Sequence, residues 1–181
     1  DSISKGEGMS YNEGVVTPGG TSPLWVLTLG FIYAITNPSI MAQLHIAIGL
    51  SAIGTVLTVL SITAFGWWTT RKAWVGLLAG TITALTGRFI WMGLSGMEMT
   101  AFTALCILAL WSHIYDIRQQ STFGWRTGII TALATLARPE GYLLAVLIGL
   151  DAFIIVPLIE RAAYWQRIRY GWRGIVSYLL L

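Results

Sequence analysis

The feature that most constrains this chain is a long stretch without any charged side chain, from residue 14 to residue 70. A helix needs about 20 apolar residues to cross a bilayer, so this stretch alone has room for more than one membrane element. Of all 181 residues, only 10% are charged and 55% are hydrophobic, and the mean hydropathy is +0.70. An ordinary soluble domain carries far more charge, so the sequence indicates a protein that is solvated by lipid.

The apolar runs are continuous, which distinguishes between the two kinds of structure that span membranes. Transmembrane β-strands alternate apolar and polar residues, and open sheets leave backbone groups unpaired in lipid. The sequence therefore predicts an all-α, polytopic helical membrane protein with about five transmembrane helices. The predicted spans are residues 40–69, 73–94, 98–115, 123–138 and 141–159, and a further span starts near residue 174.

The first apolar segment, residues 22–36, has two interpretations. Its 15 residues would measure about 22 Å as a helix, against about 30 Å of hydrocarbon. The length favours an interfacial helix with the N-terminus outside, whereas a crossing segment would place the N-terminus inside. Residues 1–21 form the predicted extracytoplasmic loop, and residues 22–181 form one transmembrane helical domain. The chain begins in a polar segment and stops within an apolar run, so we expect a fragment truncated at both ends.

The basic residues of the predicted loops indicate which side of the membrane each loop faces. Positive charge marks the cytoplasmic side, and eight basic residues share one side: Arg71, Lys72, Arg118, Arg126, Arg161, Arg167, Arg169 and Arg173. Tryptophans gather at the same span ends, as an interfacial belt does: Trp67, Trp68, Trp74, Trp111, Trp125, Trp165 and Trp172. The opposite side, which carries Glu98, Arg138 and Glu140, is therefore predicted to be extracytoplasmic.

Two charged motifs lie at the ends of apolar runs, where ionisable residues are costly and are functional candidates. The first is Ser95-Gly96-Met97-Glu98. Glu98 is predicted to open a helix, where the helix dipole favours a carboxylate and Ser95 could cap the N-terminus. A capped helix start without further function remains an alternative for this motif.

The second motif is Arg138-Pro139-Glu140-Gly141. Pro139 interrupts helical hydrogen bonding and Gly141 permits unusual backbone angles, so the motif predicts a tight break between two helices. The guanidinium of Arg138 is a planar fork suited to phosphate or carboxylate. The alternative is an Arg–Glu pair that only solubilises a loop, since exposed pairs of this kind are common.

The remaining ionisable residues give weaker signals. Arg88 lies in an otherwise uncharged span, where it would snorkel outward or line a polar cavity, and Asp151 is its suggested partner. His45 and His113 have no second ligand at metal spacing, which favours packing roles. Cys106 is the only cysteine and is expected to fill space within a helix.

Several function classes leave no signature in this sequence. We find no nucleotide-binding glycine loop, no Ser-His-Asp set, no cofactor motif and no basic patch with interleaved aromatics that would indicate nucleic acid. Metal dependence stays open. An Arg with two carboxylates at a membrane surface suits an anionic, lipid-linked substrate, because the Arg would bind phosphate while a carboxylate acts as a general base or orients a sugar.

Four motifs in this order and spacing resemble the bacterial GT-C glycosyltransferases, a class that includes arabinofuranosyl, aminoarabinose and mannosyl transferases. The motifs are Gly8-Met9-Ser10-Tyr11-Asn12, Thr21-Ser22-Pro23-Leu24-Trp25, Ser95-Gly96-Met97-Glu98 and Ala137-Arg138-Pro139-Glu140-Gly141. The resemblance covers residues 2–160. It implies a multi-pass protein of the bacterial cytoplasmic (inner) membrane, with an extracytoplasmic active site.

The resemblance also implies a reaction and a set of roles. A polyprenyl-phosphate sugar is the expected donor, and a hydroxyl on a glycan, lipid or protein is the expected acceptor. Glu98 is the catalytic candidate, and Arg138, Glu140 and Arg88 would contact the donor phosphate or line the cavity. An acceptor loop would contain Tyr11, Asn12, Thr21 and Ser22. The family's acidic motif falls upstream of Asp1, so we expect the principal catalytic Asp outside this fragment.

Two other classes remain as alternatives. A transporter or lipid-handling component would also place polar residues near span ends and break its helices, although such folds tend to contain paired broken helices, and the sequence shows one Pro-Gly break. A non-catalytic membrane scaffold would use Arg138 and Glu140 only as an ion pair.

Overall fold

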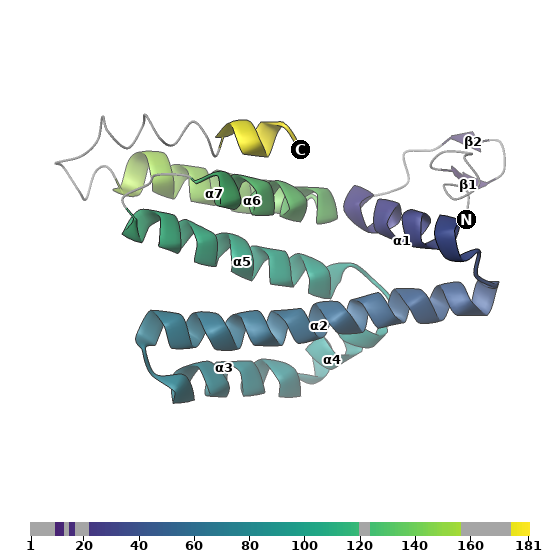
Figure 1. Ribbon diagram of the computed structural model, residues 1–181, viewed down its shortest axis with the longest axis horizontal. Coiled ribbons are helices and arrows are strands. Elements are labelled where there is room, and N and C mark those ends of the chain that lie inside the picture. Colours follow the sequence, from purple (N-terminus) through teal and green to yellow (C-terminus); the bar gives the residue numbers. More distant parts are fainter. Residues whose placement is uncertain (1–9, 13–14, 17–21, 120–123, 157–174) are drawn as a thin grey trace.

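The computed structural model describes residues 10–12, 15–16, 22–119, 124–156 and 175–181, and these are predominantly helical (Figure 1). The helices are α1 (Pro23–Thr36), α2 (Ile40–Thr70), α3 (Ala73–Leu85), α4 (Gly87–Leu94), α5 (Met99–Arg118), α6 (Trp125–Ala137), α7 (Gly141–Leu150) and the π-helix η1 (Asp151–Ile155). Residues 175–179 are also helical. The predicted helical fold class is confirmed.

A small antiparallel strand pair lies in the segment that the sequence predicts as a loop. Strand β1 (Ser10–Asn12) pairs with β2 (Val15–Val16), with Ser10 opposite Val16 and Asn12 opposite Val15. The tyrosine and valines of this segment have high β-propensity, a signal that the polar, glycine-rich composition of residues 1–21 obscures.

Helix α2 is the longest described helix and packs against three others. It contacts α3 and α4 on one side and α5 on another, while α5 packs on α6 and α6 packs on α7. Helices α2, α5, α6 and α7 and the bent α3–α4 pair run in alternating directions along the chain, so the turns between them gather at two ends of the bundle (Figure 1). The α2–α3 and α5–α6 connections lie at one end, and the α4–α5 and α6–α7 connections lie at the other.

Fewer helices are long enough to cross a membrane than the sequence predicts. Helices α2 and α5 are long and apolar enough to cross a membrane, and the α3–α4 pair adds a third span if its two helices are counted together. Helix α6 has 13 residues and α7 with η1 has 10 and 5, all below the usual length of about 20. Helix α1, at 14 residues, also remains short, as the interfacial interpretation expects.

The predicted span 73–94 is not one straight helix. It bends by 64° between α3 and α4, at Thr86, whose backbone is extended with φ −70° and ψ 111°. Thr and Gly have low helix propensity, so the Thr86-Gly87 pair gives a helix little local support here. No proline marks this break, which is why the sequence pattern missed it.

One end of the bundle carries the basic and aromatic residues. Arg71, Lys72, Arg118 and Arg126 all lie at or beside helix ends there. The guanidinium of Arg118 lies 4.0 Å from the ring centroid of Trp68, which also contacts the rings of Trp111 and Tyr115. The other predicted loop arginines, together with Trp165 and Trp172, lie outside the described residues. The described basic residues of the predicted cytoplasmic loops therefore gather at one end, as the sequence predicts.

Glycines on α3 let α2 and α3 approach closely. A Cβ on Gly76 would overlap the carbonyl oxygen of Thr63 and lie 2.9 Å from the backbone nitrogen of Trp67. Both atoms belong to the α2 backbone, which cannot move aside as a side chain can.

We predict that Gly76→Ala destabilises the protein by about 1–3 kcal/mol, because the added methyl forces α2 and α3 apart. Gly49→Ala is the matched control, since a Cβ there meets nothing within 4 Å. Thermal unfolding in detergent micelles measures both. Equal melting temperatures for the two variants would contradict the close packing.

Candidate functional site

The break between α6 and α7 presents Arg138 and Glu140 at one end of the bundle. Arg138 is extended, with φ −155° and ψ 146°, because the proline ring disfavours the helical region for the residue before it. Helix α7 then restarts at Gly141, whose backbone nitrogen donates to the Arg138 carbonyl at 2.9 Å. The predicted tight break is confirmed.

Gly141 is needed here for a different reason from the one that the sequence suggested. It lies at the start of α7 and, unlike Gly96, is not among the described residues with positive φ. A Cβ on Gly141 would lie 2.5 Å from the Cα of Thr135. Close approach of α6 to α7, and not an unusual backbone angle, therefore requires glycine at this position.

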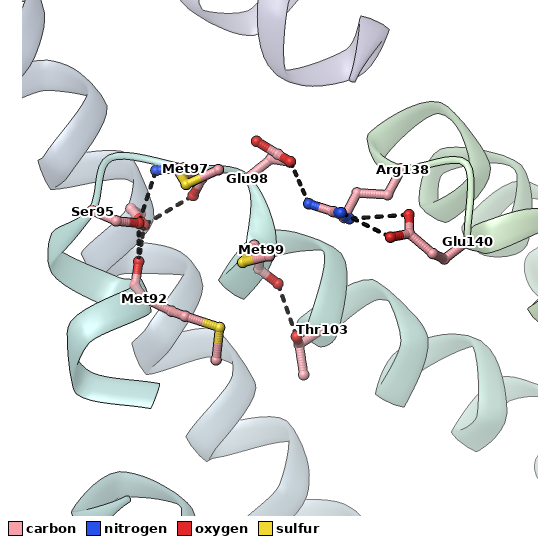
Figure 2. Close-up of polar contacts among 9 residues, drawn as sticks. Met92, Ser95, Met97, Glu98, Met99, Thr103, Arg138 and Glu140 are labelled. Carbon is pink, nitrogen blue, oxygen red and sulfur yellow. Dashed lines mark hydrogen bonds and ion pairs between the residues drawn. The ribbon is translucent and has the colours of Figure 1, made fainter. Parts of the chain in front are cut away.

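Glu98 lies at the end of a turn that its neighbours brace. Ser95 Oγ donates to the Met92 carbonyl at 2.7 Å and accepts from the Met97 backbone nitrogen at 3.3 Å (Figure 2). Gly96 in the same turn has φ +71°, which suits glycine. Glu98 itself is the N-cap of α5, and no side chain caps that helix. Ser95 thus stabilises the turn and does not cap α5 as predicted.

Arg138 joins the two motifs through three hydrogen bonds, shown in Figure 2. Its Nη1 donates to Glu98 Oε1 at 2.7 Å. Its Nε donates to Glu140 Oε2 at 3.1 Å and its Nη2 to Glu140 Oε1 at 2.8 Å. The guanidinium is therefore held by one carboxylate through one nitrogen and by the other through its Nε–Nη2 edge.

The two carboxylates differ in their access to solvent. The side chain of Glu98 is 11% exposed and that of Glu140 is 57% exposed, with Arg138 between them at 21%. The hydrogen bonds from Arg138 hold the pKa of Glu140 below its ordinary value, and the hydrogen bond to Glu140 raises the pKa of Arg138. The charged forms of Arg138 and Glu140 are therefore both favoured at neutral pH.

Arg88 does not join this cluster. It lies in the first turn of α4, just after the bend, and is exposed. Within the described part of the chain it forms no ion pair, and the suggested pairing with Asp151 is wrong because Asp151 contacts His113 instead.

The acceptor-loop candidates are only partly described. Ser22 is buried, 6% exposed, and is the N-cap of α1, although its side chain makes no capping bond. Tyr11 and Asn12 belong to β1, and Thr21 lies outside the described residues. Helix α1, which follows Ser22, packs against α6, the helix that ends at Arg138.

Two polar contacts between helices were not predicted. Ser51 Oγ lies 3.0 Å from the carbonyl oxygens of both Met92 and Met97, so α2 anchors the turn that carries Glu98. His113 Nε2 lies 2.8 Å from Asp151 Oδ2, at the start of the π-helix, so His113 is not the solitary packing residue that the sequence indicated. Each contact joins residues about 40 positions apart, and no local spacing could have shown it.

The described residues contain no group of three or more His, Cys, Asp and Glu side chains that could hold a metal ion. Glu98 and Glu140 are both engaged by Arg138. The cluster therefore consists of one guanidinium that is paired with two carboxylates.

Comparisons with known proteins add no assignment. No family model matches the chain, and no curated protein and no solved structure is significantly similar to it.

We predict that Arg138→Met raises the pKa of Glu140 towards its ordinary value, because the hydrogen bonds that favour the carboxylate are lost. Any stabilisation from this pair is present above the ordinary Glu pKa and disappears as the pH falls through the lowered pKa. Carbon-13 NMR of the Glu carboxyls in micelles measures the titration, and Glu140→Gln assigns the signal. Arg126→Met, at the opposite end, is the control. An unchanged Glu140 midpoint in Arg138→Met would show that the pair does not exist in solution.

Proposed function

We propose that this chain belongs to a membrane glycosyltransferase of the GT-C type, which transfers a sugar from a polyprenyl phosphate to an acceptor hydroxyl. The proposal includes about five membrane spans, an interfacial α1 and an active site on the extracytoplasmic side of a bacterial inner membrane. The observation that carries it is the guanidinium of Arg138, which bridges two carboxylates at one end of the bundle.

The location of the cluster supports an extracytoplasmic site. It lies at the end opposite Arg71, Arg118 and Arg126, and positive charge favours the cytoplasmic side. A lipid-linked donor keeps its chain in the bilayer and its phosphate at the surface. An Arg at the end of a short helix pair is then within reach of that phosphate, and the resemblance of the four motifs to the GT-C class agrees with this placement.

The chemistry assigns different work to each group. As the sugar transfers, the lipid phosphate leaves with its negative charge, and an Arg fork stabilises that charge through paired hydrogen bonds. Because Arg138 already engages Glu98 at 2.7 Å, we assign Glu98 to positioning the guanidinium, and not to abstracting the acceptor proton. The acceptor would enter beside Ser22 and the β1 segment that contains Tyr11 and Asn12.

One observation favours the transporter alternative. The bend at Thr86 gives a second broken helix beside the break at Pro139, and paired broken helices are typical of transporters. Movement of a substrate across the membrane without any sugar transfer would identify the protein as a transporter.

We predict that Arg138→Ala in the full-length protein lowers sugar transfer about 100-fold, while membrane insertion persists. The assay uses purified membranes, a panel of polyprenyl-phosphate sugars and a radiolabelled donor sugar. Arg126→Ala, which removes an arginine at the opposite end, is the control and should transfer normally. Wild-type turnover by Arg138→Ala would overturn the assignment.

A further inference from the structure

The two carboxylates that hold Arg138 are not equivalent. Glu98 accepts one hydrogen bond, from Nη1, and its side chain is 11% exposed. Glu140 accepts two, from Nε and Nη2, and its side chain is 57% exposed. The more exposed partner therefore occupies the two-donor edge of the guanidinium.

That edge is one of the two-donor faces through which an arginine binds phosphate. Two parallel N–H donors match two oxygens of a phosphate as well as they match a carboxylate. In this cluster, Oε1 and Oε2 of Glu140 lie where two phosphate oxygens would lie. Glu140 thus has the geometry of a ligand supplied by the chain itself.

The charge of the cluster makes exchange more favourable than addition. Two carboxylates face one guanidinium, so a third anion on Arg138 would meet uncompensated negative charge. Glu140 is able to leave, because its side chain is largely in water and an exposed ion pair contributes little. Glu98 is not, because it is buried at the end of a turn that Ser51 and Ser95 brace.

We propose that Glu140 is an internal placeholder: the phosphate headgroup of a lipid ligand displaces its carboxylate from Nε and Nη2 of Arg138, while Glu98 keeps its contact with Nη1. This inference rests on the proposed function in one respect, which is that the lipid ligand carries a polyprenyl chain. The placeholder sets a threshold, because every competing anion has to displace Glu140 first. Weakly binding phosphates of bulk lipids are then rejected, which is specificity by competition.

The test compares two substitutions that each remove one negative charge from the same guanidinium. Full-length wild type, Glu140→Gln and Glu98→Gln are placed in phosphatidylcholine nanodiscs and titrated with farnesyl phosphate by calorimetry. Loss of the competitor is expected to tighten binding about fivefold in Glu140→Gln. Glu98→Gln is expected to weaken binding, because Arg138 loses the partner that orients it. In an Arg138→Met background, Glu140→Gln should have no effect.

Equal tightening by Glu98→Gln, or a gain that persists without Arg138, would reduce the effect to general electrostatics and overturn the placeholder. A titration with inorganic phosphate distinguishes a lipid headgroup from free phosphate as the ligand. Inorganic phosphate that binds as tightly as farnesyl phosphate would overturn a lipid as the source. Binding that depends on Arg138 but not on Glu140 overturns this inference alone, whereas the expected binding pattern without any sugar transfer overturns only the transferase proposal.

Discussion

A single guanidinium connects the two helix breaks at one end of this molecule. Arg138 follows α6 and reaches Glu98 at the start of α5 and Glu140 at the start of α7. Removing one partner of a buried ion pair leaves a charge without compensation, which is strongly unfavourable. Because Glu98 is 8% exposed, the separation of α5 from the α6–α7 break would isolate its carboxylate. The geometry of this end therefore depends on one side chain.

The position of Glu98 depends in turn on how helices pack when lipid surrounds them. Apolar side chains gain little from burial there, so close backbone contact and hydrogen bonds hold helices together. Ser51 on α2 contacts the carbonyls of Met92 and Met97, and Thr100 Oγ1 donates back to the Ser51 carbonyl at 2.7 Å. Hydroxyl groups in apolar helices thus fix the turn, and the turn presents the carboxylate to Arg138.

Local signals predicted the parts of the fold that local chemistry determines. Pro139 separates α6 from α7 as expected. Thr86 carries no comparable marker, so the bend of α3–α4 was missed. The gathering of basic loop residues at one end could be predicted, because such residues prefer the cytoplasmic side of a membrane.

Contacts between segments far apart in the chain could not be predicted from the sequence. Glu98 and Arg138 were both chosen as candidates, yet nothing in their spacing shows that they share a hydrogen bond. His113 was assigned to packing, although Asp151 lies 2.8 Å from it. An ion pair between helices depends on which faces meet, and a single sequence does not specify that for helices whose apolar residues surround the axis.

The most direct measurement is an electron cryomicroscopy structure of the full-length protein with a bound polyprenyl phosphate. The account predicts density for the phosphate at Nε and Nη2 of Arg138, with Glu140 rotated into solvent and Glu98 still in contact with Nη1. A phosphate bound elsewhere, with the Arg138–Glu140 pair intact, would contradict it.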